Sequence, residues 1–281
     1  MTINEALKEA VSLFSGNVKT PSLDASLLLC ELLNQNKTDL IIHGNNEITK
    51  KNYCKYQKLL KRRLKGECIA YILGRKEFFG LDFIVNKNVL VPRPETEILV
   101  EKSLELLNCK NSKILDLCTG SGAIAIAIKH KEPLLEVWAA DISKKALVIA
   151  RQNAAIHCLH INFLQSDLFN DITVNDIKGC FNMIITNPPY VCSQTIDTLE
   201  PEVKKEPRLA LDGGHDGLYL IRKIIIDSLQ YLLPGGILLM EADSGQIPEI
   251  EKLLCDAGYR ECNFYKDLSG QLRVISARFL G

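Results

Sequence analysis

From residue 92 onward, short apolar runs alternate with segments of helical periodicity, and this alternation constrains the fold more than any other feature. The apolar runs are Lys113–Leu117, Glu136–Ala140, Asn162–Leu164, Met183–Thr186 and Ile237–Met240. Strands that alternate with helices predict a parallel sheet with helices on both faces. Ligands of such sheets lie beyond the carboxyl ends of the strands. We therefore expect an α/β domain with its functional residues at these strand ends.

Two further strand candidates stand near the end of the chain with no room for a helix between them. They are Tyr259–Tyr265 and Arg273–Phe279, joined by Lys266–Leu272. A link this short joins antiparallel neighbours. We expect these two segments to form a hairpin at one edge of the sheet.

The first third of the chain has a different pattern. Residues 1–74 carry apolar side chains at helical spacing, and residues 75–91 show strand-like alternation with a glycine break. The sequence therefore predicts a helical domain over 1–74, a β-hairpin connector over 75–91 and the α/β domain over 92–281.

Charge and cysteine content exclude several classes of protein. The chain has 281 residues, and its 34 Lys and Arg balance its 34 Asp and Glu. Proteins whose main task is to grip duplex DNA carry a basic excess. None of the ten cysteines forms a C-x-x-C pair or a cluster with histidines, so we expect free thiols and no metal site. Met1–Phe14 is an interrupted amphipathic stretch rather than a signal peptide or membrane span, and we expect a cytoplasmic protein.

The first strand of the α/β domain ends in a loop of small residues, Asp116–Gly122. Small residues let the backbone turn sharply and let a ligand lie against main-chain N–H groups at a helix start. Asp141 ends the next strand, where a carboxylate can accept both hydrogen bonds of a ribose diol. These two features predict a nucleoside-containing cofactor.

A nicotinamide cofactor would fit the same glycines, since Gly120-x-Gly122-x-x-Ala125 matches a dinucleotide fingerprint. Two carboxylates weigh against an oxidoreductase. Asp116 would repel a pyrophosphate but attract the ammonium group of a methionine. Asp167, followed by Leu168 and Phe169, can receive the edge and faces of an adenine. The combination favours S-adenosylmethionine.

The strand Met183–Thr186 ends in Asn187-Pro188-Pro189-Tyr190. Two consecutive prolines lock the backbone and remove two donors. The Asn187 side-chain oxygen and the Pro188 carbonyl remain as acceptors, which suit the two donors of an NH2 group, and Tyr190 offers an aromatic face to a planar group. A conjugated nitrogen is a weak nucleophile, so acceptors that hold it in line also favour the positive charge that develops on it. The loop therefore predicts methyl transfer to an amide or aromatic amine.

These motifs resemble the class I methyltransferases of the NPPY group, which includes DNA adenine and protein glutamine methyltransferases. Further segments over nearly the whole chain are similar to the protein glutamine methyltransferase family that modifies peptide chain release factors. They are Tyr71–Gly74, Glu77–Phe78, Val91–Glu97, Glu206–Leu211, Gly213–Leu218, Glu241 and Asp267–Arg273. The resemblance implies a seven-stranded, mostly parallel class I methyltransferase sheet with an antiparallel C-terminal hairpin and a small N-terminal helical domain.

The resemblance also implies an activity and its residues. S-adenosylmethionine would donate a methyl group, leaving S-adenosylhomocysteine, to the glutamine side-chain amide in the Gly-Gly-Gln motif of class I release factors. With the strand-end carboxylates, the cofactor contacts would be Cys118, Thr119, Gly120, Ser121, Gly122, Asp141, Asp167, Leu168 and Asn187. The glutamine would be held by Asn187, Pro188, Pro189 and Tyr190, with Asn187, Pro188 and Tyr190 as catalytic candidates. The segment Pro92–Glu97 would help to close the site.

We expect a monomer that uses no metal, contacts no membrane and binds no nucleic acid stably. Methylation of a ribosomal-protein glutamine is the nearest alternative, because the same fold and loop would serve. A DNA adenine N6-methyltransferase is a further alternative. It would need a region that flips and reads a base, and residues 92–281 are just long enough for the sheet and its helices.

Four positions depart from the family pattern, among them Cys68 in place of a frequent proline and Asp243 in place of a usual glycine. Cys118 stands where glycine is usual, so a left-handed turn there would be strained. Leu168 replaces a common aromatic residue. None of the four departures touches Asn187–Tyr190.

One helical segment, residues 50–65, is rich in positive charge and has no acidic residue. Its basic residues are Lys50, Lys51, Lys55, Lys58, Lys61, Arg62, Arg63 and Lys65. One interpretation is the solvated face of a helix whose Tyr56, Leu59, Leu60 and Leu64 pack inward. Another is a docking surface for an acidic protein partner, which would make residues 1–74 a substrate-docking domain. Nucleic acid binding is a third, for which one short basic helix is thin support.

Overall fold

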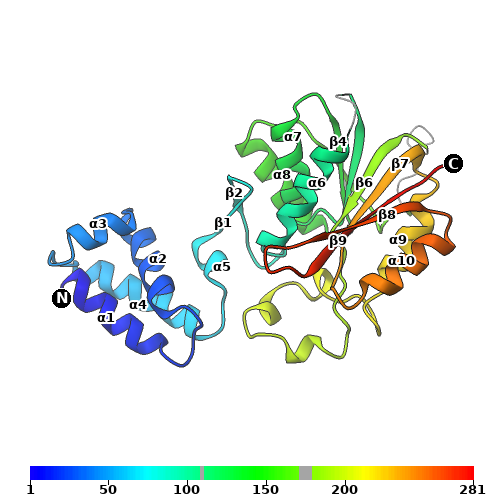
Figure 1. Cartoon of the computed structure of the whole chain (residues 1–281). Coiled ribbons are helices and arrows are strands. Elements are labelled where there is room, and N and C mark those ends of the chain that lie inside the picture. Colours follow the sequence, from blue (N-terminus) through cyan, green and yellow to red (C-terminus); the bar gives the residue numbers. More distant parts are fainter. Residues whose placement is uncertain (108–110, 171–178) are drawn as a thin grey trace. The chain divides into compact units, whose positions relative to one another are not determined.

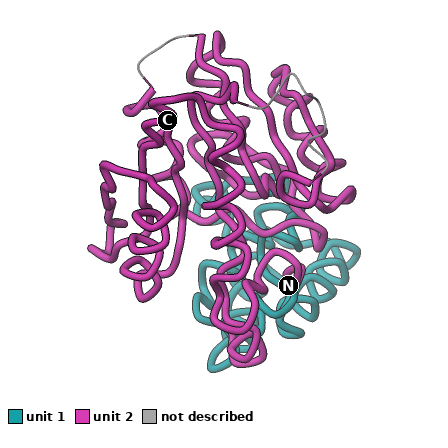
Figure 2. The backbone as a smooth tube through the Cα atoms, turned by 90° about the vertical axis from the view of Figure 1, so that its right-hand side faces the viewer, with its two compact units in different colours: residues 1–75, 200–205 teal, residues 76–199, 206–281 magenta. Residues whose placement is uncertain are grey.

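The protein is described by a computed structural model that covers residues 1–107, 111–170 and 179–281 (Figure 1). The chain divides into two compact units (Figure 2). Unit 1 comprises residues 1–75 and 200–205, and unit 2 comprises residues 76–199 and 206–281. Cys109, one of the predicted free thiols, lies outside the described residues.

Unit 1 is built from helices around an apolar core. The helices are α1 (Ile3–Phe14), α2 (Pro21–Leu33), α3 (Lys37–Ile42), α4 (Lys50–Leu64) and α5 (Ile69–Leu73). Local sequence explains several of their ends: Thr2 and Glu5 form a capping box at α1, proline opens α2, and the Thr49 side chain caps α4. Phe14, Leu28 and Tyr56 are among the fully buried side chains between them.

Helix α4 corrects part of the sequence prediction. Leu64, expected in the core, is exposed, whereas Arg63, counted among the charges of the basic face, is 4% exposed. Its guanidinium pairs with the equally buried carboxylate of Asp24 and with Glu202, which belongs to the distant segment 200–205 of the same unit. Arg63 follows Tyr56 and Leu60 at helical spacing, so it lies on the buried face of α4. Its charge is compensated there by the acidic side chains that it pairs with.

A two-stranded sheet follows the helices. It pairs β1 (Arg75–Phe78) with β2 (Leu81–Ile84). The Asn153 amide holds this hairpin: it accepts from the Ile84 nitrogen, and it donates to the carbonyls of Ile84 and Ser121.

Within the described residues, seven strands form the large sheet of unit 2, in the order β5-β4-β3-β6-β7-β9-β8. The strands β3 to β7 run parallel, and β9 and β8 complete the sheet as an antiparallel hairpin at one edge. Their bounds are Lys113–Leu117 (β3), Glu136–Asp141 (β4), Asn162–Gln165 (β5), Phe181–Thr186 (β6), Leu232–Glu241 (β7), Arg260–Lys266 (β8) and Leu272–Arg278 (β9). The predicted fold class is confirmed.

Helices cover both faces of this sheet (Figure 1). One face carries α6 (Glu97–Leu106), α7 (Ala123–Lys131) and α8 (Lys144–Ile156), and the other carries α9 (Tyr219–Ser228) and α10 (Ile247–Asp256). Short 3-10 turns lie at Pro94–Thr96 (η1), Ile196–Thr198 (η2), Val203–Lys205 (η3) and Arg208–Ala210 (η4). Strands β3 and β6 are buried on both faces of the sheet, which explains why their residues are mostly apolar rather than alternating between apolar and polar.

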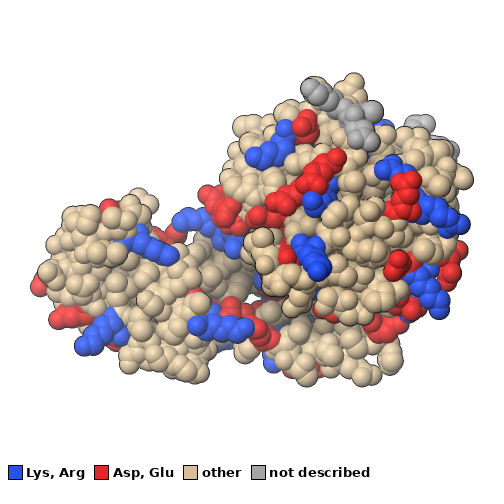
Figure 3. Space-filling view, in the orientation of Figure 1, with Lys and Arg blue, Asp and Glu red and all other residues tan. Residues whose placement is uncertain are grey.

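Charged side chains of both signs are interspersed on the visible face of each unit (Figure 3). Among the described residues, no helix is both long and apolar enough to span a bilayer. The same part of the chain holds no group of three or more His, Cys, Asp or Glu side chains arranged to bind a metal ion.

Candidate active site

The loop after β3 turns through left-handed backbone conformations. Cys118, Gly120 and Gly122 have φ of 63°, 56° and 81°. At Gly122, which caps α7, an added Cβ would lie 3.0 Å from Ile126 and 3.1 Å from Ala150, so helix packing as well as the turn requires glycine. Cys118 accepts the left-handed turn with a side chain present, which is the strained case that the sequence raised.

The same backbone conformation occurs at a second position facing this loop. Leu168, after β5, has a φ of 51° and is buried. Nothing in the sequence indicated this strain, since leucine is rarely found in that region. Strained residues that persist in a well-packed fold gather at ligand sites.

Asp116 is completely buried beneath the loop. Its Oδ2 accepts from the Thr119 hydroxyl at 2.6 Å and from the Ala125 nitrogen at 3.2 Å. Its Oδ1 is buried with no hydrogen-bond partner among the described residues. Burial, together with a smaller contribution from the charge of Asp141, raises the pKa of Asp116 to about 7 against the opposing effect of those two hydrogen bonds. An unsatisfied buried carboxylate oxygen of this kind is ready for a cationic donor.

Asp141, at the end of β4, is the second carboxylate of the site. Its Oδ2 accepts from the Gly120 nitrogen and its Oδ1 from the Ser143 nitrogen, both at 2.8 Å. Burial raises its pKa despite these bonds. Each oxygen keeps a second lone pair for a further donor, such as a hydroxyl. Asp167 stands exposed after β5, so three carboxylates lie at or near the carboxyl ends of three neighbouring strands. This field favours a cationic ligand and disfavours a pyrophosphate.

A cavity of about 600 Å³ opens at this edge of the sheet. Of the predicted site residues, its lining includes Cys118, Gly120, Asp141, Asp167, Leu168, Asn187 and Pro189. Thr119, Ser121, Gly122, Pro188 and Tyr190 are not part of that lining. Thr119 and Ser121 are instead buried within the loop, where the Thr119 hydroxyl supports Asp116 and the Ser121 carbonyl accepts from Asn153.

The loop after β6 leaves the sheet beside the loop after β3. Leu117 pairs with Thr186 in the register of the two parallel strands, so Cys118 and Asn187 are the next residues on adjacent strands. The Asn187 Nδ2 donates to the Thr96 hydroxyl oxygen at 3.2 Å. This bond engages the amide nitrogen and leaves Oδ1 to accept from a ligand in the cavity.

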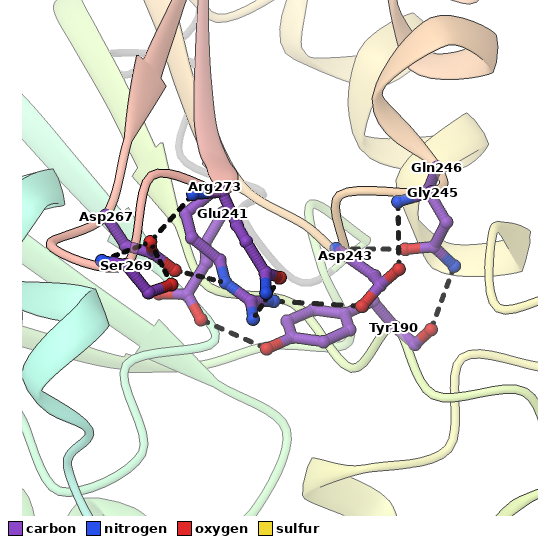
Figure 4. A network of polar contacts seen from close by, with 9 residues as sticks. Tyr190, Glu241, Asp243, Gly245, Gln246, Asp267, Ser269 and Arg273 are labelled. Carbon is purple, nitrogen blue, oxygen red and sulfur yellow. Dashed lines mark hydrogen bonds and ion pairs between the residues drawn. The ribbon is translucent and has the colours of Figure 1, made fainter.

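Tyr190 is fixed at both its ends (Figure 4). Its hydroxyl donates to Glu241 Oε1 at 3.1 Å, and its carbonyl accepts from Gln246 Nε2 at 3.0 Å. Burial and the neighbouring Glu241 raise the pKa of Tyr190, so the phenol stays protonated and donates. Gly213 and Gly217 lie against the same loop: an added Cβ at Gly217 would lie 2.3 Å from the Tyr190 carbonyl oxygen. The loop Asn187–Tyr190, called the reaction loop below, is therefore held in place from several sides.

Sequence reasoning missed two parts of this site. One is the segment Pro207–Asp212 with Tyr219 and Leu220, which lines the cavity opposite the strand ends, together with Asn88–Leu90. The other is the role of Thr96 and Glu241 behind the reaction loop. Thr96, Glu241 and Pro207–Leu211 lie in segments that carried the family resemblance, whereas Asn88–Leu90, Tyr219 and Leu220 do not. Nothing in the spacing of any of them along the chain indicated which strand end they meet.

Family comparisons agree with this geometry. Residues 5–74 match the family model described as the PrmC N-terminal domain, and residues 94–205 match the methyltransferase small domain. A release factor glutamine methyltransferase of Coxiella burnetii is 40% identical over 280 residues, covering 99% of both chains. That of Thermodesulfovibrio yellowstonii is 38% identical over 276 residues, covering 96% of both. The chain belongs to the release factor glutamine methyltransferase family.

Membership of the release factor glutamine methyltransferase family makes the chain a methyltransferase. The fold is shared more widely: a methyltransferase from Pyrococcus furiosus superposes with a TM-score of 0.55 at 20% identity, covering 80% of this chain and 99% of that one. The helical unit 1 contains the first family match, and the cavity lies wholly within unit 2.

Proposed function

We propose that this methyltransferase transfers a methyl group from S-adenosylmethionine to the side-chain amide nitrogen of the glutamine in the Gly-Gly-Gln motif of class I release factors. The observation that carries the proposal is Asn187: its Nδ2 is engaged by Thr96, so its Oδ1 is free to accept from an NH2 group in the cavity that the loop after β3 also lines. Relatives at 38–40% identity that bear the name of this activity support it.

The chemistry of the cavity fits S-adenosylmethionine. When bound, this cofactor supplies an electrophilic methyl group on a sulfonium. Asp141 lines the cavity, and its spare lone pairs fit a ribose diol. Asp116 is buried beneath the loop rather than part of the cavity lining, and its unpartnered Oδ1 fits an ammonium group that reaches it there. The cysteine and glycine backbone of residues 118–122 and the exposed Asp167 with buried Leu168 complete the proposed cofactor contacts.

The acceptor amide would be held by the reaction loop. Asn187 Oδ1 and the Pro188 carbonyl accept its two N–H donors, and the Tyr190 ring lies against its plane. Pro188 and Pro189 fix the backbone so that these acceptors do not reorganise as positive charge develops on nitrogen. The segment Pro92–Glu97 supports the loop through Thr96. In this arrangement the proton leaves after attack, so no general base is required.

We further propose a division of labour along the chain. Residues 1–74 dock the protein substrate, 75–91 connect, and 92–281 carry out the transfer. The docking surface would be the exposed lysines of α4, without the buried Arg63.

The proposal is tested by transfer of labelled methyl from S-adenosylmethionine to a purified class I release factor, with its Gly-Gly-Gln→Gly-Gly-Ala variant in parallel. We expect label in the first protein and none in the second. Equal labelling of both would refute the assigned acceptor. If neither is labelled although the cofactor binds, the release-factor assignment is wrong, and ribosomal proteins and DNA are the substrates to offer next.

A further inference from the structure

Glu241, the last residue of β7, is a buried carboxylate directly behind the reaction loop (Figure 4). It is 2% exposed. Its Oε1 accepts from the Tyr190 hydroxyl, and its Oε2 is buried with no hydrogen-bond partner among the described residues. Burying a carboxylate costs folding free energy, especially when one of its two oxygens has no hydrogen bond. We therefore look for a role of Glu241 other than stabilising the fold.

The Thr96 hydroxyl lies between this carboxylate and Asn187. Its oxygen accepts from Asn187 Nδ2, and its polar interaction with Glu241 lowers the pKa of that carboxyl, which favours the ionised form. A hydroxyl has one proton to give. If Thr96 gives that proton to Glu241, its oxygen can only accept from Asn187.

We propose that Glu241 is a positioning residue for methyl transfer: its carboxylate accepts from Thr96, and this fixes the Asn187 amide with its nitrogen toward Thr96 and its oxygen toward the acceptor. The inference rests on the proposed function, because it names what orients the acceptor site of that reaction. A neutral partner at position 241 that can donate would let Thr96 donate to Asn187 Oδ1 instead. The amide would then turn its NH2 toward the substrate NH2, where two donors meet and neither is satisfied.

The charge of Glu241 is set by burial and by groups on η1, on the loop after β6 and on β9. Burial raises the pKa of Glu241, and the charge of Glu95 in η1 adds to this. The polar contacts of Thr96 and Tyr190 and the charge of Arg273 in β9 lower it. The net direction is upward. Arg273 is itself held by Asp267 at 3.1 Å, with Asp243 3.7 Å away on its other side (Figure 4). Because the ionised form is the orienting one, transfer should be lost as pH falls through this raised pKa, above the ordinary glutamate value of about 4.3.

The test compares three matched variants at saturating cofactor. Glu241→Gln keeps the shape but adds a donor, and Thr96→Val keeps the shape but removes the hydroxyl. Both should lower kcat by about 30-fold or more while the cofactor dissociation constant stays within about threefold. Thr96→Ser, which retains the hydroxyl, should keep kcat within about threefold of the parent chain. The double variant Glu241→Gln/Thr96→Val should be no slower than either single variant, because all three break one chain of bonds.

The decisive readout is the pH profile of kcat, which a merely structural glutamate would not shape. The parent chain should show an acid limb that Glu241→Gln lacks. Full kcat with an unchanged acid limb in Glu241→Gln, or full kcat in Thr96→Val, overturns the inference.

A second measurement separates this inference from the proposed function. The side-chain amide signals of Asn187, identified by their absence in Asn187→Ala, can be followed by NMR without any substrate. They should titrate with pH in the parent chain and become insensitive to pH in Glu241→Gln. Insensitive signals in the parent chain would refute the inference even if release factors are methylated. Titrating signals with no methylation would support it and refute the proposed substrate.

Discussion

The loops after β3 and β6 leave adjacent strands side by side, yet they are held in different ways. The β6 loop is braced by partners of the protein itself: Thr96 on Asn187, and Glu241 and Gln246 on Tyr190. The β3 loop carries a left-handed cysteine above a buried carboxylate oxygen with no partner among the described residues. Under the proposed function, the acceptor side of the site is preorganised, whereas the donor side stores unfavourable free energy that a bound cofactor would relieve.

Physical chemistry gives a reason for this division. A weakly nucleophilic amide gains most from acceptors that do not move during reaction, since their reorganisation would add to the barrier. A cofactor that must enter and leave as product at each turnover gains from a site that is costly when empty and satisfied when filled. On the acceptor side, the ionised carboxylate of Glu241 would contribute to this preorganisation by orienting Thr96 and, through it, Asn187.

The largest effect on the cofactor side of the site is expected from Asp116→Asn, which tests whether the unpartnered carboxylate oxygen serves cofactor binding. The amide oxygen can keep the bonds from Thr119 and Ala125, and its NH2 takes the place of the unpartnered Oδ1. We expect the cofactor to bind about 100-fold more weakly, a loss of about 2.7 kcal/mol, measured by calorimetry.

The same variant should be more stable without cofactor. A carboxyl whose folded pKa is raised destabilises the fold increasingly as pH rises from about 4 to about 7. Removing it should therefore raise the free energy of unfolding by about 2 kcal/mol at pH 8, and by less at pH 5. Asp256→Asn, an exposed change of equal charge, is the control. Tighter cofactor binding with lower stability would reverse the comparison.

Cofactor affinity should depend on pH through the same carboxyl. Because the pKa of Asp116 is about 7 and a cationic ligand selects the ionised form, binding near neutrality should release a proton. Affinity should fall by up to about tenfold for each pH unit below 7 and level off above it. Calorimetry in two buffers of different ionisation enthalpy measures the released proton. A flat profile in the parent chain, or an unchanged slope in Asp116→Asn, would assign the dependence to another group.

A smaller effect is expected in unit 1, on the basic helix α4. Lys58→Glu/Lys61→Glu reverses two exposed charges without touching the buried Arg63. Methylation of a whole release factor should slow by about threefold to tenfold at low salt, and methylation of a short Gly-Gly-Gln peptide should not change. Lys131→Glu/Lys252→Glu in unit 2 is the matched control. Equal slowing on both substrates would remove the docking hypothesis.

The smallest effect is expected from Cys118→Gly. Glycine relieves the left-handed backbone at φ 63° but also gains entropy in the unfolded chain, so the two terms nearly cancel. We expect a net stabilisation of about 0.5 kcal/mol in denaturant unfolding. Cys118→Ala, which keeps the strain, should bring no gain. A large loss of unfolding free energy in Cys118→Gly would show that packing of the Cys118 side chain outweighs the strain of its left-handed backbone.

The architecture of unit 2 could be predicted because its strands are short apolar runs that alternate with helical segments, and because its loop glycines directly follow the first of these runs. The positions of Cys118, Asp141 and Asn187 at one edge follow from the parallel sheet alone. Arg63 could not be placed, because its buried position depends on Asp24 and on Glu202, which is 139 residues away in sequence. The roles of Thr96 and Glu241 could not be predicted for the same reason: no local sequence pattern indicates that η1 and β7 contact the loop after β6.

The most direct test of the comparison is to measure two quantities on Asn187→Ala: the single-turnover rate of methyl transfer and the cofactor dissociation constant. The account predicts that the rate falls by about 1,000-fold, equivalent to about 4 kcal/mol, while the dissociation constant changes by less than about threefold. A dissociation constant weakened as much as the rate would contradict the account, because Asn187 would then belong to the donor side of the site rather than to the preorganised acceptor side.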